Sequence, residues 1–212
     1  MKRIFLTGAI GCGKSTLIRA VLGDRLGVAG GFVTQRILEG EELIGFDIVS
    51  LAVSVNQEHM YPDTPKLGWR EKDGRLHLRF LSFKDGKVIR NDEAFSVFAS
   101  ALLREATMKP FALIDEIGGF EILIPEFMEA FELLLASQVP CIGVLKSLPS
   151  SERLSQTAGL GSEYLQAAKA LHLRLASDPE TEIVEMRGHD DKYAINTLWQ
   201  WKEQYLTYEG QN

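Results

Sequence analysis

A glycine-rich motif near the start of the chain constrains its fold more than any other feature. Residues 8–15 read G-x-x-x-x-G-K-S, and the apolar run 4–6 comes directly before them. This motif binds phosphate where it joins a buried strand to a helix, because the turn then points several backbone N–H groups at one anion. Residues 16–22 are predicted to form that helix, whose positive N-terminal end attracts phosphate further. The chain is therefore predicted to be an α/β protein that binds the phosphates of a nucleotide.

The motif assigns roles to its individual positions. Lys14 is predicted to reach the β- and γ-phosphates of a nucleoside triphosphate and to take part in catalysis. The Ser15 hydroxyl is predicted to coordinate Mg²⁺, which is the cofactor expected at such a loop. The residues predicted to bind phosphate are Gly8, Ala9, Ile10, Gly11, Cys12, Gly13, Lys14, Ser15 and Thr16.

Two carboxylates after a second apolar run complete the predicted site. Residues 111–114 are apolar throughout, and Asp115 and Glu116 follow them. A run without polar positions is typical of a strand covered on both faces of a parallel sheet, and ligands bind at the C-terminal ends of such strands. Asp115 is predicted to hold Mg²⁺, directly or through water. Glu116 is predicted to orient or deprotonate an attacking water molecule.

Hydrophobic periodicity along the rest of the chain predicts one domain, residues 1–212, without internal repeats. Segments 32–37 and 43–49 are predicted to form a β-hairpin, and segments 75–80 and 87–90 a second antiparallel pair. Further strands are predicted at 2–7, 111–116, 139–145 and 181–186, and further helices at 91–106, 125–137, 162–176 and from Asp190 or Asp191 to 207.

Residue composition predicts the structural role of three further segments. The Ser/Gly-rich segment 149–161 is predicted to be a surface loop. Residues 56–68 contain prolines and a glycine and are predicted to be a loop that borders the site. On the last helix, Trp199, Trp201 and Tyr205 are predicted to be packing residues.

Net charge and cysteine usage limit the expected binding partners and the expected cellular compartment of the protein. The 212 residues include 23 basic and 29 acidic ones, a formal net charge of −6, and the basic residues do not cluster. This balance argues against nucleic acid as a partner. No apolar stretch approaches the ~20 residues of a membrane span, and the few apolar residues after Arg3 are too short for a signal peptide. Cys12 and Cys141 do not suggest a disulfide framework, so we expect a cytoplasmic protein.

The chain resembles the small P-loop nucleoside-triphosphatase family that includes the cancer-related nucleoside-triphosphatase of animals and its archaeal and bacterial relatives. The resemblance lies in segment 6–16, in the hairpin segments 30–34 and 44–49, and in segment 114–118 with Glu121 and Phe127. It implies a RecA-like P-loop fold, which is a mostly parallel sheet flanked by helices with an antiparallel hairpin. It also implies Mg²⁺-dependent hydrolysis of nucleoside triphosphates to diphosphate and phosphate with broad base tolerance.

The chain departs from that family at several basic positions. Gly119 stands where the family usually has Lys, and the hairpin has Arg36, Leu38 and Leu43 where an acidic residue, an Arg and another basic residue are usual. A missing cation near the γ-phosphate removes stabilisation that is worth about 10³–10⁵ in rate where an arginine finger supplies it. The candidate substitutes are Arg36, Arg70 and Lys146.

Two other functions remain compatible with the same motifs. A P-loop kinase would transfer the γ-phosphate to a small molecule or nucleotide, with residues 56–90 shaping the acceptor pocket. A nucleotide-gated binding module would dock a partner in its triphosphate state and hydrolyse slowly. Lys146 is a candidate γ-phosphate sensor at a strand end, and Arg187 and His189 are candidates for contacts with base or ribose. The phosphate loop itself does not distinguish one base from another.

Overall fold

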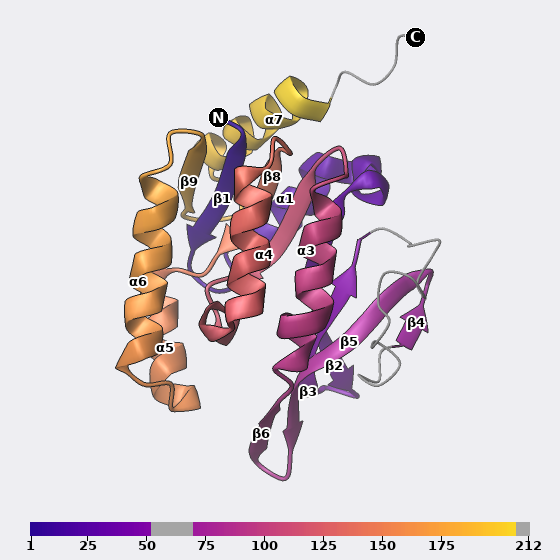
Figure 1. Cartoon of the computed structure of the whole chain (residues 1–212), viewed down its shortest axis with the longest axis vertical. Helices are drawn as coiled ribbons and strands as arrows, with labels where there is room; N and C mark the ends of the chain where they lie inside the picture. The colour runs from indigo at the N-terminus through magenta and orange to yellow at the C-terminus, as the bar shows by residue number, and fades with distance from the viewer. Residues whose placement is uncertain (52–69, 207–212) are drawn as a thin grey trace.

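The computed structural model describes residues 1–51 and 70–206, which form a nine-stranded sheet with helices on both faces (Figure 1). The strand order is β4-β5-β3-β2-β7-β8-β1-β9, and β6 pairs with β5 beside this path. The strands are β1 (Arg3–Gly8), β2 (Gly30–Glu39), β3 (Glu42–Ser50), β4 (Arg70–Lys72), β5 (Arg75–Lys84), β6 (Lys87–Arg90), β7 (Ala112–Ile117), β8 (Cys141–Leu145) and β9 (Thr181–Met186).

Helices cover both faces of this sheet. In Figure 1, α3, α4 and α6 lie in front of it and α1 lies behind. The helical elements are α1 (Lys14–Leu22), η1 (Gly23–Val28), η3 (Ala94–Ala99), α3 (Ser100–Ala106), η4 (Phe120–Leu123), α4 (Pro125–Ala136), α5 (Leu148–Ala158), α6 (Ser162–Ala176) and α7 (Lys192–Leu206). Among the described residues, no helix combines the length and apolar character needed to cross a membrane.

The central strands are apolar at successive positions because both of their faces are buried. On β1, Phe5 packs into the core beneath α3, α4 and α6, whereas Ile4 and Leu6 pack into the core beneath α1 and α7. This alternation is the two-residue period of a strand with a helix layer on each side. Strands β2, β7, β8, β1 and β9 run parallel, so their C-terminal ends meet at one edge of the sheet. The predicted α/β fold is confirmed.

An antiparallel extension continues the sheet beyond β2. The predicted hairpin is present as β2 and β3, and β2 pairs with β7 only from Gly30 to Val33. The remainder of β2 therefore projects past the C-terminal edge of the parallel strands, together with β3. The predicted second antiparallel pair is also present, as β5 and β6, but β5 pairs with β3 and so belongs to the main sheet. This extension forms a wall beside the edge where the ligand site is predicted.

The prediction of a surface loop at 149–161 is wrong, because most of this segment is helix α5. Its serines do not break the helix: Ser151 is buried, and the Ser155 hydroxyl donates to the Leu160 carbonyl. Gly159 ends the helix with φ of 63°, which is the left-handed conformation in which glycine commonly caps a helix. Composition alone therefore mistook a capped helix for a loop. The loop predicted at 56–68 lies outside the described residues.

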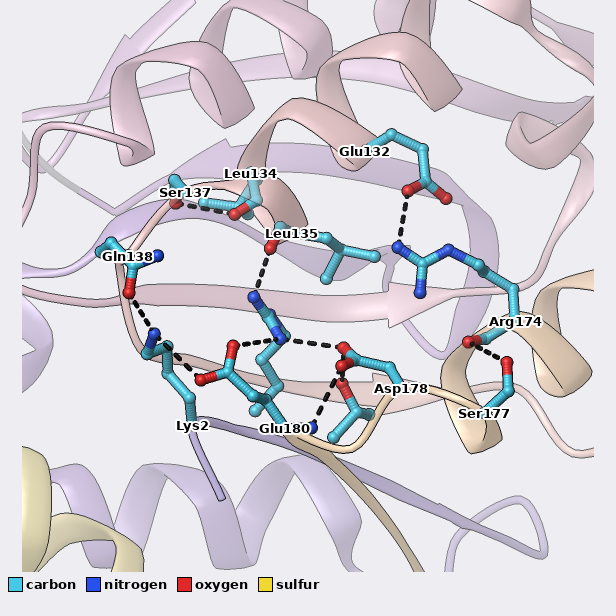
Figure 2. Close-up of polar contacts among 12 residues, drawn as sticks. Lys2, Glu132, Leu134, Leu135, Ser137, Gln138, Arg174, Ser177, Asp178 and Glu180 are labelled. Atoms are coloured by element: carbon cyan, nitrogen blue, oxygen red, sulfur yellow. Dashed lines mark hydrogen bonds and ion pairs between the residues drawn. The ribbon is translucent and has the colours of Figure 1, made fainter.

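A buried cation, Arg3, holds the N-terminal ends of the parallel strands, and Figure 2 labels its partners Leu135, Asp178 and Glu180. The Arg3 guanidinium lies 2.8 Å from an Asp178 carboxylate oxygen and 3.3 Å from Glu180, and it also donates to the Leu135 carbonyl. Nearby, Lys2 donates to Gln138 and pairs with Glu180. These contacts join the start of β1 to the end of α4 and to the turn between α6 and β9. This cluster of polar contacts lies at the N-terminal ends of the parallel strands, remote from the phosphate loop.

Candidate nucleotide site

The phosphate loop connects β1 to α1, as its sequence predicts. Gly13 has φ of 96°, and a Cβ built there would lie 2.3 Å from Nδ1 of His189. Only glycine fits such a position without strain. The Lys14 ammonium donates to the carbonyls of Gly8 at 3.1 Å and Ala9 at 2.7 Å. The lysine side chain therefore lies folded over the loop whose backbone surrounds the predicted phosphate position.

Ser15 and Asp115 meet between α1 and β7. The Ser15 hydroxyl donates to one Asp115 oxygen at 2.6 Å, and Arg19 pairs with the other oxygen at 3.3 Å. Burial raises the pKa of Asp115, although the Ser15 hydroxyl and Arg19 oppose that shift. A hydroxyl and a carboxylate are the hard oxygen ligands that Mg²⁺ prefers, so this pair suits the predicted metal.

Within residues 1–51 and 70–206, no group of three or more His, Cys, Asp and Glu side chains could hold a metal ion. Mg²⁺ commonly takes one or two protein ligands and completes its shell with phosphate oxygens and water. The Ser15–Asp115 pair offers two such protein oxygen ligands.

Glu116 follows Asp115 through a cis peptide bond and contacts a cation from the neighbouring strand. The Lys146 ammonium, just beyond β8, donates to the Glu116 carboxylate. Burial by itself would lower the pKa of Lys146, but the carboxylates of Glu116 and Glu121 outweigh burial and raise it. The Lys146 backbone is also fixed, since its N–H donates to Ile117 and its carbonyl accepts from His172 Nε2 at 2.9 Å.

Glu121 stabilises the turn that follows Glu116 by accepting backbone hydrogen bonds. Its fully buried carboxylate accepts from the N–H groups of Gly118 and Gly119, both at 2.7 Å, and burial raises its pKa. The Tyr164 hydroxyl, from α6, donates to the Gly118 carbonyl at 2.7 Å. Reasoning from the residues alone missed Glu121 and Tyr164 as parts of the site, although the family resemblance included Glu121. The Gly118–Gly119 pair was the available signal, because two free N–H groups in a buried turn need an acceptor.

One cavity of about 680 Å³ joins these groups at the C-terminal edge of the parallel strands. The predicted residues that line it are Ile10, Gly11, Gly13, Lys14, Ser15, Thr16, Arg36, Asp115, Glu116, Lys146 and His189. Gly8, Ala9 and Cys12 belong to the loop but do not line the cavity. Arg70 pairs with Asp47 instead, and Arg187 borders a separate hollow of about 450 Å³. Leu38 is exposed on the hairpin and Leu43 does not line the cavity.

The cavity also has an aromatic part that the sequence did not reveal. Phe46 on β3, Phe80 on β5, Phe95 on η3 and Phe120 on η4 line it, with Leu81 beside them. These rings come from four separate elements, so no local spacing in the sequence links them. The site therefore has a polar part around the phosphate loop and an apolar part against the antiparallel extension.

Comparison with known proteins identifies the family of this chain. A family model described as NTPase matches residues 3–163, which is more than half of the chain. The chain is 34% identical over 148 residues to the nucleoside-triphosphatase THEP1 of Thermococcus kodakarensis, covering 68% of this chain and 75% of that protein. It is 29% identical over 157 residues to the mouse cancer-related nucleoside-triphosphatase homolog, covering 70% and 75%.

The fold is also similar to solved structures. THEP1 from Aquifex aeolicus superposes with a TM-score of 0.58 at 18% identity, covering 96% of this chain and 99% of that one. A human cancer-related nucleoside triphosphatase superposes with a TM-score of 0.56 at 19% identity, covering 99% and 100%. At this identity the likeness concerns the fold alone. The family match, however, covers both the phosphate loop and the Asp115–Glu116 strand, and the chain therefore belongs to the NTPase family.

Proposed function

We propose that this protein hydrolyses nucleoside triphosphates to diphosphate and phosphate, with Mg²⁺ and with broad base tolerance. One observation carries the proposal: a single cavity holds Lys14, the Ser15–Asp115 pair and Glu116. The names of the relatives, which are nucleoside-triphosphatases, support the same activity.

The proposed mechanism gives each side chain one task. The loop N–H groups and Lys14 bind the β- and γ-phosphates, and Ser15 and Asp115 would hold Mg²⁺, which supplies positive charge to the phosphate oxygens. Glu116 accepts a proton from the attacking water. The water oxygen bonds to the γ-phosphorus, the bond to the β–γ bridging oxygen breaks, and the diphosphate leaves with that electron pair.

Lys146 supplies a cation beside the reacting groups in this proposal. Gly119 has no side chain with which to provide charge, whereas the ammonium of Lys146 lines the same cavity and contacts Glu116. It is therefore the proposed γ-phosphate sensor. Arg36 also lines the cavity, from the projecting part of β2, and is a second candidate for this task.

Broad base tolerance is expected because the proposed contacts are mainly with the phosphates of the nucleotide and not with its base. The contacts proposed for the phosphates come from backbone groups and Lys14, which do not distinguish one base from another. Arg187 and His189 are the residues predicted to contact the base or ribose, and of these two His189 lines the cavity. The cytoplasm is the proposed location, because Cys12 and Cys141 are both free thiols.

Phosphate release from ATP, GTP, CTP and UTP, with Mg²⁺ and with EDTA, tests the proposal. Wild type should release phosphate only with the metal, and both Lys14→Ala and Glu116→Gln should abolish release while Glu116→Gln still binds nucleotide. Glu126→Gln, at an exposed position on α4, is the matched control and should behave as wild type. Full release by Glu116→Gln would exclude the role proposed for that carboxylate.

A further inference from the structure

We infer that the aromatic part of the cavity is a second-substrate compartment for a small molecule that carries a planar ring and a hydroxyl group. This inference rests on the proposed nucleotide site and goes beyond hydrolysis. The compartment is defined by Phe46, Phe80, Leu81, Phe95 and Phe120.

Strand order places this compartment beyond the terminal phosphate. The phosphate loop follows β1, which lies between β8 and β9. Glu116 and Lys146 come from the β7 and β8 side, whereas His189 follows β9 and touches the loop at Gly13 from the other side. In the proposed binding mode, the γ-phosphate faces Glu116 and the nucleoside lies toward His189 and β9. The cavity continues in the opposite direction, past β7 to residues of β2, β3 and β5.

Ring packing suits this compartment to a flat ligand. Phe80 and Phe95 pack edge to face with centroids 5.1 Å apart, and Phe95 and Phe120 do so at 5.3 Å. Phe95 and Phe120 are buried, and Phe46 and Phe80 are half-buried. The buried rings therefore fix the orientation of Phe80, while part of Phe46 and Phe80 stays accessible from the cavity. Aromatic side chains bind other rings by offset stacking or edge contacts.

Polar groups border the compartment on the side of β2. Thr34, Gln35 and Arg36 lie on the projecting part of that strand and line the same cavity. Gln35 and Arg36 are exposed, so their side chains are available to a polar or anionic group on the ligand's rim. A hydrolase needs neither an aromatic wall nor this border to admit water. Both features fit an organic substrate.

The reaction needs no group beyond those already proposed. The ligand's hydroxyl oxygen would bond to the γ-phosphorus, and the bond to the β–γ bridging oxygen would break. The diphosphate leaves with that electron pair, and the hydroxyl proton passes to Glu116 as a proton from water would. The product is a phosphate ester, so the same site would act as a kinase when the compartment is filled.

Three fluorinated probes test the compartment by ¹⁹F NMR in the presence of Mg²⁺ and a non-hydrolysable ATP analogue. 4-Fluorophenol, 4-fluorobenzyl alcohol and 2-(4-fluorophenyl)ethanol place the hydroxyl at increasing distance from the ring. We expect saturable binding of at least one probe, weakened about fivefold by Phe46→Leu and by Phe80→Leu, because each loses one aromatic contact. Trp199→Leu is the matched control, since Trp199 is exposed on α7 and does not line the cavity.

Replacing the analogue with ATP tests the transfer step. ³¹P NMR should then show a phosphate ester of the bound probe, absent with Glu116→Gln and absent with 4-fluorobenzyl methyl ether, which has no hydroxyl. Lack of saturable binding, or equal binding to wild type and both phenylalanine variants, would overturn the compartment. A bound probe without any ester would overturn its role as phosphate acceptor. Phosphate release without probe is measured in parallel, so failure of the proposed hydrolysis is seen separately.

Discussion

The ammonium of Lys146 contacts the carboxylate of Glu116 across the C-terminal ends of neighbouring parallel strands. Lys146 is mostly buried, and its backbone is tied to β7 and to His172 on α6. The proposed proton acceptor therefore has a fixed cation next to it. Removing that cation should affect the chemical step more than nucleotide binding.

Replacing Lys146 by Met should lower kcat by about 100-fold and change KM little, because losing one preorganised charge in an active site costs about 10²–10³ in rate. Lys146→Arg should recover part of the loss. Steady-state phosphate release measures both constants. Lys169→Met, at an exposed position on α6, should leave them unchanged. A Lys146→Met enzyme with the wild-type kcat would show that the ion pair is only structural.

Gly13→Ala should weaken nucleotide binding and lower stability by about 1–3 kcal/mol, the usual cost of one residue held in an unfavourable backbone conformation. The added methyl group would also meet the His189 ring. Thermal unfolding with and without MgATP measures both effects. Gly11→Ala separates the two causes, because Gly11 has φ of 79° but open space around its Cβ position. Equal losses in the two variants would mean that the His189 contact contributes nothing.

Iodoacetamide at pH 8 should alkylate Cys12 and spare Cys141. Cys12 is half-buried in the phosphate loop, with its sulfur 3.6 Å from the Lys14 ammonium. Cys141 is buried in β8, and burial raises its pKa to about 12, so it stays a protonated, unreactive thiol. Bound MgATP should slow alkylation of Cys12, because phosphate contacts hold the loop backbone on either side of it. Peptide mass spectrometry reports both sites, and alkylation of Cys141 at the rate of Cys12 would contradict the buried, protonated state of that thiol.

Asp178→Asn should lower stability by about 2 kcal/mol at pH 7, because the buried Arg3 guanidinium loses a charged hydrogen-bond partner (Figure 2). Burial alone would raise the pKa of Asp178, but hydrogen bonds from Thr181 and Glu180 and the charge of Arg3 lower it. A lowered folded-state pKa stabilises the protein above the ordinary Asp value of about 3.9 and loses that effect as pH falls through the folded-state value.

Urea unfolding of wild type and Asp178→Asn at several pH values measures this difference. The gap between the two proteins should be constant above about pH 5 and should shrink below about pH 4. Asp92→Asn is the control, because Asp92 pairs with Arg90 at an exposed position, where ion pairs are worth about 0–1 kcal/mol. A gap that persists unchanged at pH 2 would mean that the Asp178 charge is not its source.

Where the sequence predicted structure well, the information was local. The phosphate loop, the β2–β3 hairpin and the buried strand before Asp115 each depend on residues close together in the chain. The loop prediction for segment 149–161 was wrong because its serines and glycines are equally compatible with a loop and with a capped helix. Whether a serine is buried and hydrogen-bonded, as Ser155 is, depends on what packs against it.

The sequence by itself determined that the chain has a strand–loop–helix phosphate motif and a buried strand that ends in two carboxylates, because glycine spacing and continuous apolar runs are local physical constraints. Only the tertiary structure decided which side chains share the cavity. Lys146 meets Glu116 because β8 lies next to β7, and the four phenylalanines meet because β5 joins the sheet beside β3. Strand order is set by packing over the whole domain, and residues that meet through it need share no pattern along the chain.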